Sequence, residues 1–142
     1  MTETPAEQDF DTWYDRFGGE PFFTELVHGF YQRVALDEKL RPMYPEADLG
    51  PAEERLRLFL MQYWGGPKTY GEQRGHPRLR MRHAPFAVTF AARDRWLQHM
   101  DASLTDIQNS SLALDDIAHT ELWTYLTSAA DAMVNQNPAL QG

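Results

Sequence analysis

Residues 52–67 of the chain read AEERLRLFLMQYWGGP, an amphipathic helix followed by an abrupt stop. Apolar side chains recur at helical spacing along one face, at Ala52, Leu56, Phe59, Leu60 and Tyr63. Charged residues occupy the other face, and Pro51 stands where the first turn of a helix tolerates proline. The glycine pair and Pro67 cannot continue a helix. The pattern therefore predicts a helix from about residue 51 to residue 63 with one buried face.

The stretch that follows is rich in glycine, proline and basic residues. Residues 65–75 contain five glycine or proline residues and are predicted to form a loop with little helix of its own. Residues 76–83 read HPRLRMRH, which predicts a short helix with Pro77 in its first turn. Pro85 limits the continuation of that helix beyond Ala84.

Amphipathic segments flank this region on both sides. The spacing of apolar residues predicts helices over about 11–17, 21–36, 89–107 and 115–134. The inward stripe of the last helix is expected to comprise Ile117, Leu122, Tyr125, Leu126, Ala129 and Met133. Leucine occurs 15 times and isoleucine and valine together 6 times, a balance that favours helices over sheets. The fold class is therefore predicted to be all-α.

Length, cysteine content and charge narrow the classes of function. A chain of 142 residues has the size of one domain, which we expect over residues 11–136 between a flexible acidic leader (1–10) and a C-terminal tail (137–142). The lack of cysteine excludes disulfide scaffolds, thiolate metal sites and iron–sulfur clusters. No apolar run approaches a membrane span and no secretory signal is evident, so a cytoplasmic protein is expected. A net charge of −8 argues against binding to nucleic acid.

The charge is unevenly distributed. Residues 68–95 carry a net charge of +5, whereas the rest of the chain carries −13. A basic segment on an acidic protein suggests a small anionic ligand. Solvated arginines on a helix surface are the alternative interpretation.

His83 stands out among the histidines because it closes the short basic helix. His76 lies seven residues earlier, about 10.5 Å along a helix, which is too far for both to bind one ion. A single imidazole can instead be the axial ligand of a haem iron. The apolar stripe of residues 52–63 offers a wall for the porphyrin, and neighbouring arginines suit its propionates. The alternative is a surface or hydrogen-bonded histidine.

Three aromatic residues carry polar tips on apolar faces or at a bend: Tyr31, Tyr44 and Trp96. Buried phenols and indoles normally find a hydrogen-bond partner, and a diatomic ligand would be one. Core packing is the alternative.

The order of these motifs resembles that of the group II truncated haemoglobins, most closely their actinobacterial branch. The landmarks are FGG (17–19), FYQRV (30–34), YPE (44–46), the stretches 52–67 and 70–86, and RDRWL (93–97). The likeness covers about residues 11–136, and the run from 52 to 86 is its most specific part.

The resemblance implies a truncated globin fold, a two-over-two helical sandwich that encloses haem b. It implies that His83 is the proximal iron ligand and that the distal side carries Tyr31, Tyr44 and Trp96. The haem pocket is expected to be lined by Ala52, Leu56, Phe59, Leu60, Met81 and Phe86. The expected propionate partners are Arg55, Tyr63 and Arg82.

The function implied by the resemblance is reversible binding of oxygen, carbon monoxide and nitric oxide at a five-coordinate iron. Several distal donors suit oxygen, nitric oxide or peroxide chemistry better than bulk transport. The alternative is a haem enzyme, a peroxidase or a nitric oxide dioxygenase, whose turnover depends on an external reductase. A haem-free helical interaction module is the third reading. An apolar stripe exposed on one of the last helices would favour a homodimer.

Overall fold

The computed structural model describes residues 10–135, which fold into helices joined by turns. The helices are α1 (Trp13–Phe17), α2 (Glu20–Ala35), the 3₁₀ helix η2 (Arg41–Met43), α3 (Gly50–Tyr63), α4 (Thr69–Arg74), α5 (Leu79–His83), α6 (Phe90–Gln108) and α7 (Asp116–Met133). The all-α class predicted from the sequence is confirmed.

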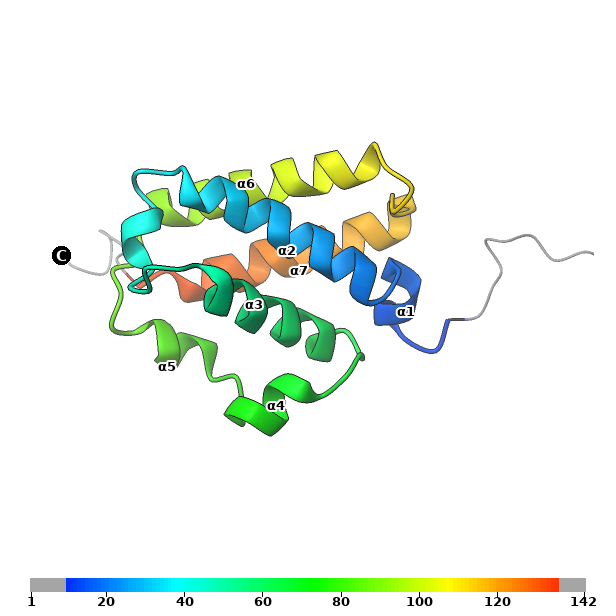
Figure 1. Cartoon of the computed structure of the whole chain (residues 1–142), viewed down its shortest axis with the longest axis horizontal. Coiled ribbons are helices and arrows are strands. Elements are labelled where there is room, and N and C mark those ends of the chain that lie inside the picture. The colour runs from blue at the N-terminus through cyan, green and yellow to red at the C-terminus, as the bar shows by residue number, and fades with distance from the viewer. Residues whose placement is uncertain (1–9, 136–142) are drawn as a thin grey trace, which may run out of the picture.

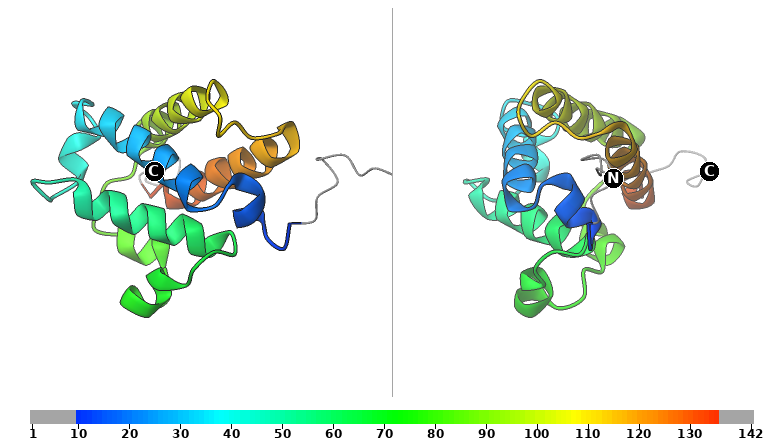
Figure 2. Two further views of the ribbon diagram at one scale, coloured as in Figure 1. Left: turned by 45° about the vertical axis from the view of Figure 1, so that its right-hand side comes forward. Right: turned by 90° about the vertical axis from the view of Figure 1, so that its right-hand side faces the viewer.

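The four longest helices form two stacked pairs, α2 with α3 and α6 with α7 (Figures 1 and 2). α2 also packs against α6, which joins the two pairs. This contact is close at Gly29, because a Cβ added there would lie 2.5 Å from the Ser103 Oγ. The same Ser103 Oγ donates a hydrogen bond of 2.7 Å to the Leu26 carbonyl. The arrangement is the two-over-two sandwich that the sequence predicts.

One hydrophobic core lies between the helix pairs. Its largest fully buried side chains include Phe22, Phe23, Leu26, Phe30, Leu60, Met100, Leu104, Leu122 and Leu126. The rings of Phe17 and Trp64 meet edge to face with centroids 4.9 Å apart and so join α1 to the end of α3. Within residues 10–135, none of the helices combines the length and the hydropathy that crossing a bilayer requires.

The prediction of a loop over residues 65–75 was wrong, because α4 forms within it. Tyr70 is buried and its ring packs against Phe59 at 5.5 Å. The backbone N–H of Gly71 donates to the Gln62 side chain at 2.8 Å. These contacts with α3 stabilise a helical turn that the local glycine content disfavours.

Two smaller expectations also need correction. The short basic helix begins at Leu79 rather than near residue 76, because Arg78 has a left-handed backbone with φ of 46°. Ile117 was expected to face inward, but 62% of it is exposed in the first turn of α7. The buried face of α7 comprises Ala118, Leu122, Leu126 and Ala130.

Replacement of Asp115 by alanine is expected to lower the free energy of unfolding by about 1 kcal/mol at neutral pH, the usual cost of losing a helix cap. The Asp115 carboxylate accepts a hydrogen bond of 2.8 Å from the Ala118 N–H at the start of α7. It also forms an ion pair of 3.1 Å with Arg16, which lowers the pKa of Asp115. Urea denaturation of both proteins measures the difference.

The same substitution also has an expected pH dependence. Because the pKa of Asp115 is lower in the folded than in the unfolded chain, its stabilising effect is present above pH 4 and decreases as the pH falls below that value. The cost of Asp115→Ala should therefore shrink in acid. Asp115→Asn, which retains a capping oxygen, should cost less at neutral pH. An equal cost for both variants would contradict the capping role.

Candidate functional site

His83 is the last residue of α5, and its ring is oriented by the same helix. Its Nδ1 lies 2.7 Å from the carbonyl oxygen of Leu79, one turn earlier. A carbonyl only accepts hydrogen bonds, so the Nδ1 carries the proton and donates it. In the neutral ring, the Nε2 then has a free lone pair, which is the arrangement that a metal-ligating imidazole requires.

The segment after His83 is held by Asn135, just beyond the end of α7. The Asn135 side-chain amide donates to the carbonyls of His83, at 3.2 Å, and Phe86, at 2.9 Å. Its side-chain oxygen accepts from the Val88 N–H at 2.9 Å. α5 also packs against α7. Asn135 thus fixes the backbone around His83, a role that the sequence analysis missed because a lone asparagine far along the chain gives no pattern.

The structure brings Tyr31, Tyr44 and Trp96 together from three separate elements. Tyr31 comes from α2, Tyr44 follows η2, and Trp96 lies on α6. The rings of Tyr31 and Tyr44 meet edge to face at 5.6 Å. Phe30 packs against both Tyr31, at 4.9 Å, and Trp96, at 5.1 Å. The three polar aromatic residues therefore lie in one neighbourhood, and their distal role stays a prediction.

The two phenols of this cluster stay protonated at neutral pH. Burial raises the pKa of Tyr31 well above its usual value. Burial also raises the pKa of Tyr44, an increase that hydrogen bonding from Tyr31 and Trp96 opposes. The negative charge of Glu46 raises the pKa of both phenols further. Each therefore retains an O–H group that can donate.

Tyr44 is held by a polar frame that the sequence analysis overlooked. The guanidinium of Arg41 donates to the backbone carbonyls of Tyr44 at 3.0 Å, of Glu46 at 2.8 Å and of Ala47 at 2.9 Å. The Glu46 carboxylate forms an ion pair with Arg55 of α3, which lowers the pKa of Glu46. The YPE motif of residues 44–46 was the available signal for this frame, but the sequence alone did not indicate what Glu46 binds.

The residues expected to line the haem pocket lie at different depths. Ala52, Phe59 and Leu60 are buried on α3, and Leu56 is half-buried beside them. Two of the expected residues come from α5 and the segment after it. Met81 on α5 is 61% exposed, and Phe86, which follows α5, is half-buried.

The expected propionate partners already have neighbours within the protein. Arg82 donates to the carbonyls of Pro77, at 2.7 Å, and Arg74, at 3.0 Å, and so braces the turn before α5. Tyr63 is 51% exposed and its ring stacks on Tyr125 at 4.0 Å. The structure does not bring Arg55, Tyr63 and Arg82 into one cluster by any contact among them.

Comparison with known proteins agrees with this arrangement. The family model described as "Bacterial-like globin" matches residues 12–135. The group 2 truncated haemoglobin YjbI of Bacillus subtilis is 37% identical over 132 residues, which cover 93% of this chain and 95% of that protein. The chain therefore belongs to the bacterial-like globin family, within its group II truncated haemoglobins.

Solved structures show the same fold at high similarity. A thermostable haemoglobin from the actinobacterium Thermobifida fusca is 61% identical, with a TM-score of 0.82, and the match covers 87% of this chain and 97% of that one. A truncated oxygen-avid haemoglobin from Bacillus subtilis is 36% identical, with a TM-score of 0.79, over 88% of this chain and 100% of that one. The predicted truncated globin fold is confirmed.

The family implies a haem cofactor, and the residues of this chain fit one. Globin iron takes one imidazole as its protein ligand. The Nδ1 hydrogen bond of His83 at 2.7 Å fixes the tautomer that offers the Nε2. Met81, on the same short helix, leaves 61% of its surface uncovered. A flat apolar porphyrin suits such a surface, because burying it removes apolar area from water.

Proposed function

We propose that this protein binds haem b through the Nε2 of His83 and binds oxygen, carbon monoxide and nitric oxide reversibly on the distal side. The observation that carries the proposal is the gathering of Tyr31, Tyr44 and Trp96 from three elements: the Tyr31 ring contacts that of Tyr44, and Phe30 packs against both Tyr31 and Trp96. When bound, haem would supply an iron that His83 holds and that can take a diatomic gas as a further ligand.

The distal side chains act by donating hydrogen bonds to the ligand. An indole N–H can only donate, whereas a phenol can donate or accept. The Tyr31 ring contacts that of Tyr44, and Tyr31 and Trp96 both oppose the rise that burial causes in the pKa of Tyr44. Because burial raises the pKa of Tyr44, its O–H keeps the proton that it would donate to the ligand. Donors held in place before the ligand arrives stabilise the negative charge that an oxygen ligand acquires.

Such a pocket favours slow release of oxygen. A hydrogen bond to a charged group contributes about 1.5–3 kcal/mol, which corresponds to a change in release rate of about 10–150-fold. Slow release suits oxygen, nitric oxide or peroxide chemistry better than bulk transport. The relative from Bacillus subtilis described as oxygen-avid supports this assignment by analogy. An external reductase, a homodimer and a cytoplasmic location stay predictions.

The test is the kinetics of oxygen binding by the haem-reconstituted protein. The ferrous protein is mixed with oxygen, and the association and dissociation rates are measured by flash photolysis and stopped flow. We expect slow dissociation that becomes faster in each of Tyr31→Phe, Tyr44→Phe and Trp96→Phe. Release that is equally fast in the wild type and in all three variants would overturn the proposed distal role.

The effects of Tyr31→Phe and Tyr44→Phe on oxygen dissociation are expected to be non-additive. The two phenols are in contact, with ring centroids 5.6 Å apart, and each affects the pKa of the other. Neighbouring residues in one hydrogen-bond network couple by about 0.5–3 kcal/mol. A double-mutant cycle on the dissociation rate measures this coupling. Strict additivity would show that the two residues act on the ligand independently.

A further inference from the structure

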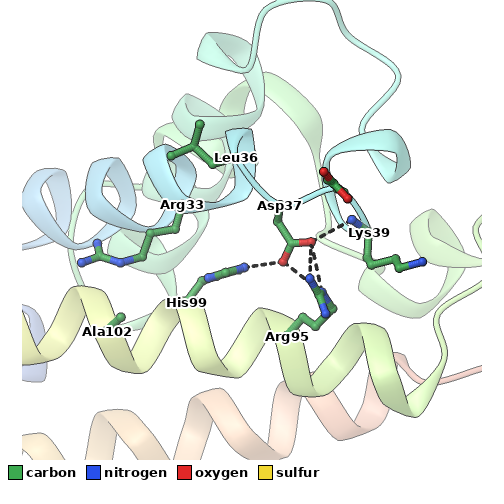
Figure 3. Close-up of a pocket in the computed structure, with 8 residues that line it drawn as sticks. Arg33, Leu36, Asp37, Lys39, Arg95, His99 and Ala102 are labelled. Atoms are coloured by element: carbon green, nitrogen blue, oxygen red, sulfur yellow. Dashed lines mark hydrogen bonds and ion pairs between the residues drawn. The ribbon is translucent and has the colours of Figure 1, made fainter.

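Asp37 is a buried carboxylate in the turn between α2 and η2 (Figure 3). Only 2% of its side chain is exposed. The Arg95 Nε donates to its two oxygens at 3.0 and 3.1 Å, and the His99 Nε2 lies 2.6 Å from one of them. The backbone N–H groups of Lys39 and Leu40 also donate to it, at 2.8 and 3.1 Å. Asp37 therefore joins its own turn to α6.

The Asp37 turn is connected to Tyr44 by a second set of hydrogen bonds. The Asp37 carbonyl accepts from the Arg41 N–H at 2.9 Å, and the Arg41 carbonyl accepts from the Tyr44 N–H at 3.1 Å. The Arg41 guanidinium holds the Tyr44 carbonyl at 3.0 Å. Arg95, at the other end of this path, directly precedes Trp96. A continuous polar path thus runs from α6 beside Trp96 to the backbone of Tyr44.

The presence of a carboxylate at this buried position indicates that Asp37 orients the groups bound to it. Burying an unpaired charge is costly, and apolar side chains of similar volume often hold helices together equally well. Charge-assisted hydrogen bonds add direction, because each donor must lie near a carboxylate oxygen. The hydrogen bonds from Arg95 and His99 lower the pKa of Asp37, so it remains charged and keeps this geometry at neutral pH.

We infer that Asp37, held by Arg95, is a positioning residue for Tyr44, and that it fixes the phenol of Tyr44 and the indole of Trp96 toward the same ligand. The inference rests on the proposed function, since it concerns the distal side of the haem. In this view, the Asp37 carboxylate does not touch the ligand, and it orients the distal donors from outside the pocket.

The test uses Asp37→Asn in the full chain, with Arg33→Met as a matched control. Arg33 also links α2 to α6, through its ion pair of 2.6 Å with Asp106, and lines the same surface depression beside Asp37 (Figure 3). It makes no bond to the turn that leads to Tyr44. In the haem-reconstituted proteins we expect Asp37→Asn to speed oxygen dissociation about fivefold and to shift or split the infrared C–O band of the carbon monoxide complex. Arg33→Met should change neither.

A second measurement needs no haem. Amide hydrogen exchange of the haem-free protein should show loss of protection at the Tyr44 N–H in Asp37→Asn but not in Arg33→Met. Arg95→Lys, which keeps the charge but loses the forked geometry, should give the same changes as Asp37→Asn. If Asp37→Asn does not fold, Arg95→Lys replaces it in these measurements.

The decisive comparison places Asp37→Asn in a Tyr44→Phe background. If Asp37 acts mainly through Tyr44, the substitution should have a much smaller effect on oxygen dissociation there, because only the part that acts through Trp96 remains. An effect of equal size in both backgrounds would overturn the inference, as would an unchanged C–O band and unchanged Tyr44 exchange. Failure of Tyr44→Phe itself to speed release would instead contradict the proposed function, so the two failures are distinguishable.

Discussion

Replacement of His83 by alanine is expected to abolish stoichiometric haem binding. The imidazole is the iron ligand that the account assigns to this chain, and its Nδ1 is already engaged with the Leu79 carbonyl at 2.7 Å so that the Nε2 is presented to the metal. Without it, the iron would have no protein ligand, and only non-covalent contacts with the porphyrin would remain. Titration of the haem-free protein with hemin, followed by the Soret absorbance, should give one equivalent bound for the wild type and no sharp end point for His83→Ala.

His76→Ala provides the matched control for this substitution. His76 is an exposed histidine of the same basic stretch, just before α5, and its removal should leave the haem stoichiometry unchanged. Addition of free imidazole to the smaller variant His83→Gly should restore binding, because the lost ligand is replaced in the space it occupied. Retention of a five-coordinate haem by His83→Ala without added imidazole would refute the assignment.

Replacement of Trp96 by phenylalanine is expected to raise the oxygen dissociation rate at least tenfold. In the wild type, the ring centroids of Phe30 and Trp96 are 5.1 Å apart. The substitution keeps an aromatic ring beside Phe30 but removes the indole N–H. The pocket then loses one hydrogen-bond donor, because phenylalanine has no N–H. The loss of one hydrogen bond to a charged ligand accounts for about a tenfold change or more. Stopped-flow displacement of oxygen by carbon monoxide measures the rate.

Trp13→Phe is the control for the loss of an indole elsewhere. Trp13 lies on α1 and stacks on Phe17 at 5.7 Å, in a part of the core formed by different residues. It should change stability without changing oxygen release. If Trp96→Phe and Trp13→Phe both leave the dissociation rate at the wild-type value, Trp96 is not a distal donor.

The fold could be predicted from sequence because its main helices carry strong local signals. Apolar periodicity located the buried faces of α2, α3 and α6, and glycine and proline marked the ends of α1 and α3. The failures occurred where tertiary contacts outweighed local preference. Tyr70 and the Gln62 side chain stabilise α4 within a glycine-rich stretch, and the left-handed backbone of Arg78 delays the start of α5.

The candidate site was predicted less completely than the fold. The distal aromatic residues could be named because a phenol or an indole on an apolar face is unusual enough to need a partner. The residues that hold them were not predicted. Asp37 and Arg95 are 58 positions apart in sequence, and Asn135 and His83 are 52 apart, so no local pattern joins them. The roles of Arg55, Tyr63 and Arg82 toward the propionates stay predictions.

The central claim is most directly tested by a crystal structure of the protein reconstituted with one equivalent of hemin. We expect one porphyrin whose iron is bound by the His83 Nε2, with the polar tips of Tyr31, Tyr44 and Trp96 facing the opposite side of the ring. Iron bound by a different histidine, or a porphyrin seated on the surface away from these three side chains, would contradict it.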